Sequence, residues 1–532
     1  ARFAYILKTA GIGYKDVVAN TLFNSLERAV TDTGIILAGA APINTIPSLT
    51  SGEVFFSSVR RSHAKAVVVY PSAPENSDWV LIKEGIVGAS SSSAKDRSNE
   101  VKSDGKSQAK TDKCSEVHYQ SKSLVFGFKS EKAPEMSKAI LISRSTPWQR
   151  QELPAVPHFL QFLRDQPEQN SYVDRSVKAS DNGYLFTTTG TTGMQKIVPR
   201  THSILLKIAQ TMGQMTPGTL PAMFYTTKLG WNSGFPYMFY LFGSTLVMLD
   251  ELDPIENLDH EMERAGQSID GMAVAAEAAK SQGSGQARDK MLLICTGGLP
   301  IKHNIVSQAL KSVSHAIIIG YGMTEAGVVS FNMLQRIEDY TEGDCGRLFR
   351  GVQCRITDDD RNILPPNQTG NIEFMTETLF GGFLNNVEKT REAFAPDGWF
   401  ITADLGFLKP DGTVSVVCRK GNVILHGSVL VYPTAIEIVL RKCPGVKDVV
   451  VVPVPDKVKH HNVCALVIKE VGSDLTEAGL QRSMDDLLAV PRGPELVTPH
   501  HVLFVDSFPL VQNLKTDQTK LQKMATEIIA KQ

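Results

Sequence analysis

Residues Thr187–Lys196 read TTTGTTGMQK, and this stretch directs the interpretation of the whole chain. It contains two glycines, five threonines and a lysine, and it follows the apolar segment Tyr184–Phe186. Glycine takes positive φ without a Cβ penalty, and successive backbone N–H groups in such a turn form an anion-binding concavity. The stretch therefore predicts a polyphosphate-binding loop in which Lys196 adds a positive charge. The lysine spacing is not that of a Walker A sequence. A polar surface loop between a strand and a helix is the alternative, since short motifs also occur by chance.

Length and composition set the class of protein. The chain has 532 residues, of which 42% are hydrophobic and 21% charged, so more than one globular domain is expected. A net charge of −1 gives no electrostatic basis for nucleic-acid partners. No apolar run reaches the ~18 residues of a transmembrane helix. The seven cysteines include no C-x-x-C pair, which favours a reducing compartment and a cytoplasmic protein. We expect a monomer or homodimer, with an N-terminus that is truncated.

Apolar, β-rich runs recur between helical stretches in the first part of the chain. This alternation predicts an α/β fold, with a large N-terminal domain of two αβ-layered sheets. Residues 89–122 are rich in Ser, Lys and Asp and predict a disordered insertion. The expected strands are Ala66–Tyr70, Trp79–Ile82, Ile140–Ser143, Thr245–Leu249, Leu292–Thr296 and Ala316–Ile319.

The pattern changes after residue 343. Short β-like runs alternate with turn signals such as Pro396-Asp397-Gly398, which predicts an antiparallel β subdomain over residues 343–418. A small C-terminal α/β domain is expected over residues 419–532, so the large domain covers residues 1–418. The strands expected in the small domain are Asp448–Pro453, Val463–Ile468 and His501–Val505, with helices after Pro433 and Leu475.

A second glycine-containing motif follows the expected strand Ala316–Ile319. Residues 320–327 read GYGMTEAG, in which Tyr321 can stack on an adenine and Glu325 offers a hard carboxylate suited to Mg²⁺. Upstream, residues 296–300 read TGGLP and form another glycine turn. A strand-to-helix turn with Glu325 as the helix cap is the alternative.

Two further motifs carry charged side chains. Residues 398–406 read GWFITADLG and include Asp404, whose carboxylate can accept both ribose hydroxyl protons. Arg419 follows the expected strand Thr413–Val417, and its guanidinium suits a phosphate or ribose oxygen. The alternative for Asp404 is a hairpin aspartate that accepts from backbone N–H groups. Residues 508–517 read FPLVQNLKTD and include Lys515.

In this order and spacing, the motifs resemble the adenylate-forming (ANL) superfamily, which includes the acyl-CoA synthetases and AMP-binding enzymes. The resemblance covers roughly residues 4–520. Its usual signatures are TSGTTG-x-PK, Y-G-x-T-E, G-E-I, G-W-x-x-T-G-D, G-R-x-x-D and a late N-G-K. This chain departs from them at Thr189, Gln195, Asn371, Ala403, Cys418 and Leu514.

The resemblance implies a ligase that joins a carboxylic acid to AMP from ATP, releases pyrophosphate, and passes the acyl group to a thiol. ATP, Mg²⁺ and CoA are the implied small molecules, and a mobile C-terminal domain would turn about a hinge at Gly421. It assigns catalytic roles to Lys515, Lys196, Thr324 and Glu325, with Glu325 as the metal ligand. It assigns nucleotide binding to Thr188, Thr189, Gly190, Thr191, Thr192, Gly193, Lys196, Gly297, Gly298, Tyr321, Gly322, Thr324, Asp404, Arg419 and Lys515.

The acid itself is inferred from one neutral stretch. In the amino-acid-activating branch an aspartate pairs with the substrate ammonium, and Gly230 takes its place here, within Leu229–Pro236. A buried ammonium without a counter-charge is costly, so a fatty or aryl acid is favoured. The acceptor is CoA or a separate carrier protein. A luciferase-like adenylating oxygenase and a catalytically weakened nucleotide-binding relative are the alternatives.

Overall fold

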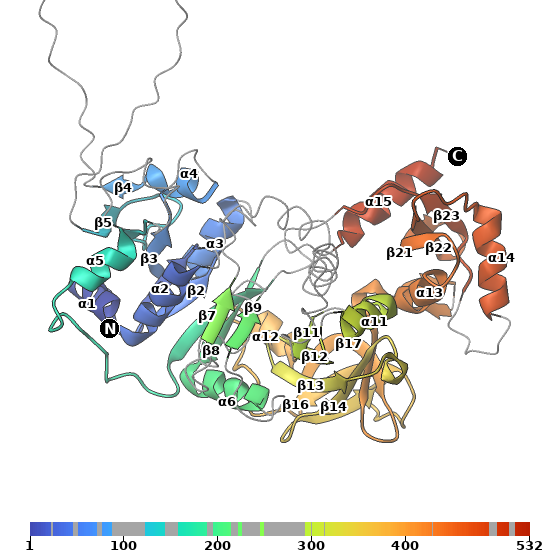
Figure 1. Ribbon diagram of the computed structural model, residues 1–532, viewed down its shortest axis with the longest axis horizontal. Helices are drawn as coiled ribbons and strands as arrows, with labels where there is room; N and C mark the ends of the chain where they lie inside the picture. Colours follow the sequence, from blue (N-terminus) through green and yellow to red (C-terminus); the bar gives the residue numbers. More distant parts are fainter. Residues whose placement is uncertain are drawn as a thin grey trace, which may run out of the picture. The chain divides into compact units, whose positions relative to one another are not determined.

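The structure is a computed structural model that describes residues 1–22, 25–45, 52–71, 77–87, 123–143, 158–188, 195–213, 222–225, 245–248, 293–298, 301–312, 314–427, 429–488, 497–509 and 516–531. The chain divides into two compact units (Figure 1). Unit 1 contains residues 1–209, 219–253 and 380–387, and unit 2 contains residues 210–218, 254–379 and 388–532.

Unit 1 is built on an eight-stranded sheet of order β4-β5-β6-β3-β1-β2-β7-β8, in which the central pairs are parallel. Helix α2 packs against β1 and β2, while α3 and α4 pack against β3. A separate parallel pair joins β9 and β10. The strands are β1 (Val17–Asn20), β2 (Ala41–Asn44), β3 (Ala64–Val69), β4 (Ile86–Val87), β5 (Val125–Phe128), β6 (Lys138–Leu141), β7 (Asn182–Thr188), β8 (Lys196–Thr201), β9 (Ala222–Tyr225) and β10 (Thr245–Met248). The helices are α1 (Arg2–Thr9), α2 (Leu26–Leu37), α3 (Gly52–Ser62), α4 (Ser77–Lys83), α5 (Phe159–Asp165) and α6 (His202–Met212).

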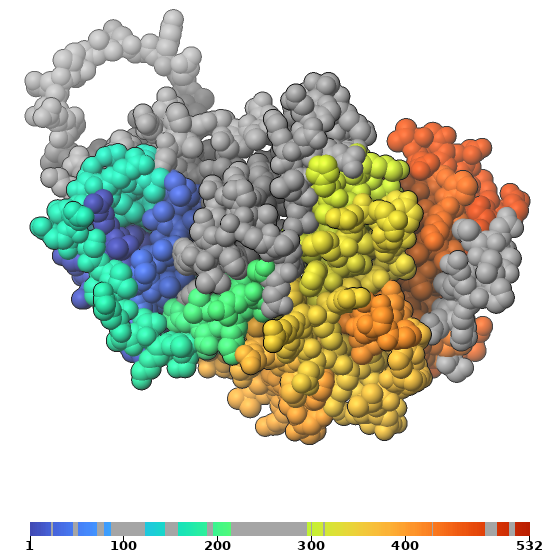
Figure 2. Space-filling model, turned by 60° about the horizontal axis from the view of Figure 1, so that its bottom comes forward, coloured from blue at the N-terminus to red at the C-terminus, as the bar shows by residue number. Residues whose placement is uncertain are grey.

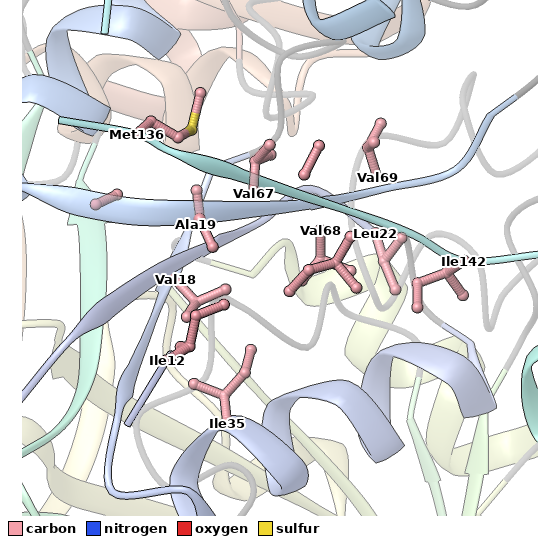
Figure 3. Packing of buried hydrophobic residues seen from close by; sticks show 14 of the residues in the cluster. Ile12, Val18, Ala19, Leu22, Ile35, Val67, Val68, Val69, Met136 and Ile142 are labelled. Carbon is pink, nitrogen blue, oxygen red and sulfur yellow. The ribbon is translucent and has the colours of Figure 1, made fainter. Parts of the chain in front are cut away.

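The core of unit 1 follows from the apolar content of its parallel strands. Val67, Val68 and Val69 are consecutive and all fully buried, as expected for a strand covered on both faces. Figure 3 shows Ile35 of α2 pointing towards Val18 of β1. The sheet is thus fixed by burial on two sides, and its strand ends are held in register.

Unit 2 begins with a second eight-stranded sheet of order β11-β12-β13-β14-β18-β17-β16-β15. In this sheet β11 and β12 pair in parallel, and each later pair is antiparallel. For the pairs among β14 to β18 this confirms what the turn signals after residue 343 predicted. In Figure 2 the yellow and orange side chains of this region form one continuous body. Its strands are β11 (Leu293–Gly297), β12 (Ala316–Met323), β13 (Gly327–Leu334), β14 (Asp344–Leu348), β15 (Gln353–Thr357), β16 (Gly370–Met375), β17 (Phe400–Leu408) and β18 (Val414–Arg419), and its helices are α11 (His303–Ser312), η5 (Ile337–Asp339) and α12 (Val387–Ala393).

The C-terminal part of unit 2 carries a five-stranded sheet in which β22 pairs with β19, β21 and β23. Its long β21·β22 hairpin contributes a row of buried valines and forms one core with α13 and α14. The expected strands and helices of this region are confirmed. The elements are η6 (Lys420–Asn422), β19 (Ile424–His426), β20 (Val429–Val431), α13 (Pro433–Leu440), β21 (Val446–Asp456), β22 (His460–Lys469), α14 (Glu477–Leu488), β23 (His501–Phe504) and α15 (Gln518–Ile529).

One expected strand is wrong. Residues 79–82 belong to helix α4. The prediction failed because an apolar run of this length fits either a strand or a buried helical face. Trp79 and Ile82, three residues apart, are both buried there, which is the spacing of a helix side. Within the described residues, no helix has the length and hydropathy needed to cross a membrane.

Candidate functional site

Three side chains named by separate motifs meet in unit 2. Tyr321 donates a hydrogen bond from Oη to Asp404 Oδ2 at 2.6 Å, and Arg419 Nε lies 2.7 Å from Asp404 Oδ1. The Asp404 side chain is 6% exposed, whereas that of Arg419 is 60% exposed. We call these three residues the open cluster. The structure brings these three predicted site residues together from β12, β17 and β18.

Strand register explains how the open cluster forms. Asp404 on β17 is the direct cross-strand partner of Arg419 on β18, so the carboxylate and the guanidinium face each other. Residues 320–323 continue β12 instead of leaving it, which places Tyr321 within the sheet. The Tyr321 ring packs on Phe374 of β16, with 5.8 Å between ring centroids. One sheet therefore fixes all three side chains.

The residue before Asp404 has an unusual backbone. Ala403 has φ +61° and is exposed, at the place where the family uses glycine. A residue with a Cβ reaches this left-handed region only with strain. The Asp404 backbone N–H donates to Thr402 Oγ1 at 3.0 Å and helps to hold the bend. The Asp404 carboxylate has two side-chain partners, Tyr321 and Arg419.

The second glycine turn lies beside the same sheet. Gly297 ends β11 opposite Gly320 of β12, and a Cβ on Gly297 would stand 2.2 Å from the Gly320 carbonyl oxygen. Only glycine allows this approach. Gly298 follows with φ +94°, and Gly322 lies in β12 next to Tyr321. The glycines thus leave bare backbone close to the open cluster.

Thr324 and Glu325 occupy the turn between β12 and β13, and both are half-buried. The strands pair antiparallel up to Met323 opposite Gly327, so the connection is a β-hairpin. The strand-to-helix turn considered as the alternative is therefore wrong. A hairpin turn presents a hydroxyl and a carboxylate close to Tyr321, and both groups are oxygen donors of the kind that Mg²⁺ prefers.

Burial and the neighbouring charge act on the tyrosine of the open cluster. Burial raises the pKa of Tyr321 well above its usual value of 10.0, and the Asp404 carboxylate raises it further. The phenol is therefore a fixed hydrogen-bond donor at neutral pH. Arg419 is largely solvated, so its guanidinium has donors left for a ligand. The cluster offers a carboxylate acceptor, an aromatic ring and a positive charge on one side of a sheet.

The ends of the predicted phosphate loop lie in unit 1. Thr188 ends β7, and Lys196 begins β8 as its direct antiparallel partner, so this segment links two strands of a hairpin. The flanking elements are therefore two strands, whereas the surface-loop alternative expected a strand and a helix. The Thr187 hydroxyl donates to the Asn44 carbonyl at 3.0 Å, and Lys196 Nζ lies 4.7 Å from the Phe383 ring centroid.

Several predicted residues lie outside the described residues. They are the loop residues Thr189, Gly190, Thr191, Thr192 and Gly193, the late lysine Lys515 with its neighbour Leu514, the insertion 89–122, and the neutral stretch Leu229–Pro236.

The expected hinge region carries contacts that motif matching did not find. Lys420 Nζ lies 2.5 Å from Asp359 Oδ1 and donates to Asn371 Oδ1 at 2.9 Å. The Asn371 amide in turn donates to Asp359 Oδ1 at 3.2 Å. Asn371 stands where the family has glutamate, and a second carboxylate could not donate to Asp359. These contacts hold Lys420 immediately before Gly421.

Sequence reasoning also missed a buried network in unit 1. Arg28 Nε lies 3.4 Å from Asp32 Oδ2, and Tyr184 Oη donates to the same oxygen at 3.1 Å. Asn20, at the end of β1, donates a hydrogen bond to Asp32, and Asn44, at the end of β2, accepts one from Arg28. All are buried. Burial alone would lower the pKa of Arg28, but Tyr184 and Asp32 raise it overall. The only sequence signal was the i, i+4 spacing of Arg28 and Asp32.

Comparison with known proteins finds two family models that match the chain. The family described as AMP-binding enzyme matches residues 1–384, and that described as AMP-binding enzyme C-terminal domain matches residues 435–515. A 4-coumarate–CoA ligase-like protein of Arabidopsis thaliana is 26% identical over 63% of this chain and 63% of its own length. The chain thus spans under two thirds of that relative. A long-chain-fatty-acid–CoA ligase of Escherichia coli O6:H1 is 26% identical over 93% of this chain and 83% of its own length.

Solved structures agree on the fold. ATP-bound MatB from Rhodopseudomonas palustris has a TM-score of 0.74 at 20% identity, covering 99% of this chain and 92% of that chain. The anthranilate CoA ligase AuaEII in complex with anthranoyl-AMP has a TM-score of 0.73 at 19% identity, covering 99% and 91%. At this identity the likeness establishes the architecture, which is the mixed α/β fold expected from the sequence.

Proposed function

The chain belongs to the AMP-binding enzyme family, and from that premise we propose that it is an acid–thiol ligase that activates a carboxylic acid with ATP. A carboxylate oxygen attacks the α-phosphorus, the bond from that phosphorus to the bridging oxygen of pyrophosphate breaks, and pyrophosphate leaves. A thiol sulfur then attacks the acyl carbon, AMP leaves, and the thiol proton is released. The open cluster is the observation that carries the proposal, because it matches the needs of a nucleoside.

Each group of the open cluster has a distinct role in this proposal. Asp404 accepts the ribose hydroxyl protons, as a buried carboxylate does strongly. Tyr321 lies against the adenine, close to the bare backbone of Gly297 and Gly298. Arg419 points its remaining donors at a ribose or α-phosphate oxygen. Together these contacts hold the nucleotide so that the carboxylate oxygen attacks the α-phosphorus in line with the leaving pyrophosphate. Catalysis then comes mainly from positioning the reactants.

The phosphates require positive potential, which we assign to other residues. Lys196 and the loop residues 188–193 hold the β- and γ-phosphates, and Lys515 from the proposed small domain 419–532 adds a charge near the α-phosphate. Glu325 and Thr324 fit a Mg²⁺ ion that accompanies ATP, because both supply oxygen ligands. Such an ion would neutralise charge on the phosphates. A rotation of the small domain about Gly421 would then move Lys515 out of the active site and give the thiol access to the acyl adenylate.

For the acid, we propose a fatty or aryl chain, and for the thiol, free CoA. The neutral stretch 229–236 supports an uncharged pocket, since it holds no partner for a substrate ammonium. The names of the relatives, which include 4-coumarate and long-chain fatty acids, span the same two classes. A carrier protein is the other acceptor to test, and we assign a monomer or homodimer in a reducing, cytoplasmic setting.

ATP–pyrophosphate exchange against a panel of fatty, aryl and amino acids tests the proposal. We expect exchange with fatty or aryl acids and none with amino acids. If ATP binds but no acid supports exchange, the chain is a weakened nucleotide-binding relative. The contact of Asp404 with Tyr321 and Arg419 supports activity over that alternative, because the three nucleotide-binding groups lie together. Light emission with a luciferin and O₂ would indicate the oxygenase.

A second test separates the two half-reactions. Lys515→Ala should strongly depress adenylate formation and spare thioester formation from a supplied acyl adenylate and CoA. The exposed Lys531→Ala, near the chain end, is the matched control and should change neither rate. An equal loss of both half-reactions in Lys515→Ala would remove this lysine from the proposed role.

A further inference from the structure

The residue before Lys196 is held by a helix that no motif includes. The Gln195 backbone carbonyl accepts a hydrogen bond from Arg61 Nη2, and its side-chain Oε1 accepts one from Ser58 Oγ at 3.3 Å. Ser58 and Arg61 lie one turn apart on α3 and so face the same side. Gln195 occupies the position where the family uses proline, so the side-chain contact with Ser58 depends on this chain's own glutamine.

A second segment closes around the same point. The Leu384 N–H donates to the Ile197 carbonyl at 2.9 Å, and Asn385 Nδ2 donates to the Arg61 carbonyl at 2.8 Å. Lys196 Nζ lies 4.7 Å from the Phe383 ring centroid. The start of β8 is therefore bracketed by α3 and residues 383–385. All of these residues belong to unit 1.

Proline at position 195 would fix its own φ and restrict the residue before it. Glutamine does neither, so the backbone next to Lys196 needs another restraint. A guanidinium that donates to a carbonyl makes a stronger hydrogen bond than a neutral donor does. Burial lowers the pKa of Arg61, which marks this guanidinium as partly desolvated against the strand.

We infer that Arg61, with Ser58, is a positioning residue that acts through Gln195 to hold Lys196 where it meets the β- and γ-phosphates of ATP. The inference rests on the proposed function, since it deepens the role given to Lys196. Arg61 touches no substrate in this assignment. Its effect should therefore appear only with ligands that reach Lys196, and only while Lys196 is a lysine.

The test is calorimetric titration of the full chain with ATP and, separately, with AMP. Arg61→Gln should weaken ATP binding by about three- to tenfold and leave AMP binding within about twofold, because AMP lacks the two outer phosphates. Arg60→Gln is the matched control. Arg60 is the neighbouring residue on the same helix, and it donates to the Lys132 carbonyl at 2.8 Å on the exposed side. Arg61→Lys should recover part of the ATP affinity.

A double-variant cycle tests whether the effect passes through Lys196. In a Lys196→Met background, Arg61→Gln should change ATP affinity by less than about twofold. Ser58→Ala should weaken ATP binding slightly in the natural sequence and not at all beside Gln195→Pro, which removes its partner. Melting curves for each variant identify any loss of folding, and the comparison uses only variants that melt like the natural chain.

The outcomes separate this inference from the proposed function. If the natural chain does not bind ATP, the proposed function fails first. If it binds ATP but Arg61→Gln behaves as Arg60→Gln does, or weakens AMP as much as ATP, the positioning role is wrong. An undiminished effect in the Lys196→Met background would also overturn it. If Arg61→Gln fails to fold, Ser58→Ala is compared in the natural sequence and in the Gln195→Pro background. A loss of ATP affinity in the natural sequence alone supports the positioning role, and an equal effect in both backgrounds overturns it.

Discussion

Two clusters of the same three residue types lie in different units of the chain. Arg28, Asp32 and Tyr184 form what we call the enclosed cluster of unit 1, and none of them is more than 1% exposed. The open cluster of Tyr321, Asp404 and Arg419 also has a buried carboxylate, whose side chain is 6% exposed, but its arginine side chain is 60% exposed.

The two clusters differ in how many of their hydrogen-bond donors and acceptors are already paired within the protein. Asp32 accepts from Asn20 Nδ2 at 2.7 Å, from Tyr184 and from Arg28. The Arg28 guanidinium donates further to Asn44 and to the Leu22 carbonyl. A buried network of this kind, satisfied within the protein, contributes to a specific fold. The open cluster has donors that reach solvent, so it can exchange water for a ligand.

The largest expected effect would break the enclosed cluster. Arg28→Met leaves the Asp32 charge buried without its counter-charge, which should cost about 3–5 kcal/mol in the free energy of unfolding. Urea denaturation of the full chain, followed by circular dichroism, measures the loss. Lys65→Met is the control, because its pair with Asp16 is 38% and 25% exposed and should contribute less than about 1 kcal/mol. Equal losses in the two variants would contradict the distinction between enclosed and exposed pairs.

The next effect should appear in binding. Asp404→Asn keeps the shape of the side chain and removes the charge that ribose hydroxyls would meet, so ATP affinity should fall by about tenfold, or about 1.4 kcal/mol. Titration with ATP measures it. Asp411→Asn is the control, since this aspartate is exposed and accepts hydrogen bonds from the Thr413 hydroxyl and backbone N–H. An unchanged ATP affinity in Asp404→Asn would show that the open cluster is structural, as the enclosed one is.

The sequence predicted these clusters unequally, and the reason is physical. Tyr321, Asp404 and Arg419 each stand in a motif whose residue types suit a nucleotide, so their meeting could be expected without coordinates. Arg28 and Asp32 are only an i, i+4 charge pair, which is usually found on an exposed helix face. Their burial depends on Tyr184, which is far away in sequence. Long-range packing of this kind leaves no local pattern.

Local patterns also misled in two places. The run at residues 79–82 is apolar enough for a strand but short enough for one helix face, and tertiary packing decided for α4. The glycine turn at residues 320–323 continues as a strand because β13 pairs with it. The antiparallel region after residue 343 was predicted correctly, because turn residues such as Asp397-Gly398 and Asp411-Gly412 act through the local backbone.

A third carboxylate extends the comparison within unit 2. Glu437 on α13 accepts from the Val451 N–H at 2.9 Å and lies 3.4 Å from Arg441, which also pairs with Glu342 at 2.9 Å. Burial raises the pKa of Glu437 above its usual 4.5, opposed by that backbone N–H and by Arg441. The ionised form is therefore disfavoured in the folded state. This cost to stability is present at neutral pH and is relieved as the pH falls through the folded pKa.

Glu437→Gln tests that sign. The glutamine keeps an acceptor for Val451 and removes the buried charge, so the variant should melt higher than the natural chain at pH about 8. The difference should shrink as the pH falls from about 8, because the natural glutamate takes up its proton. Thermal melting of both chains across this range measures it. A difference that grows as the pH falls would contradict this prediction. It would mean that pairing with Arg441 stabilises the ionised Glu437 more than burial destabilises it.

The smallest effect concerns the strain beside the open cluster. Ala403→Gly should raise the free energy of unfolding by up to about 1 kcal/mol, because glycine takes φ +61° without the Cβ clash but loses more entropy on folding. Asn367→Gly is the control, since asparagine at φ +65° tolerates the left-handed region better and should gain less. ATP affinity should stay within about twofold in both, because the hydrogen bonds of Asp404 already impose the bend. If Ala403→Gly instead loosens ATP binding, the alanine restrains the carboxylate in a way that glycine cannot. The departure from the family would then be a feature that tightens the open cluster.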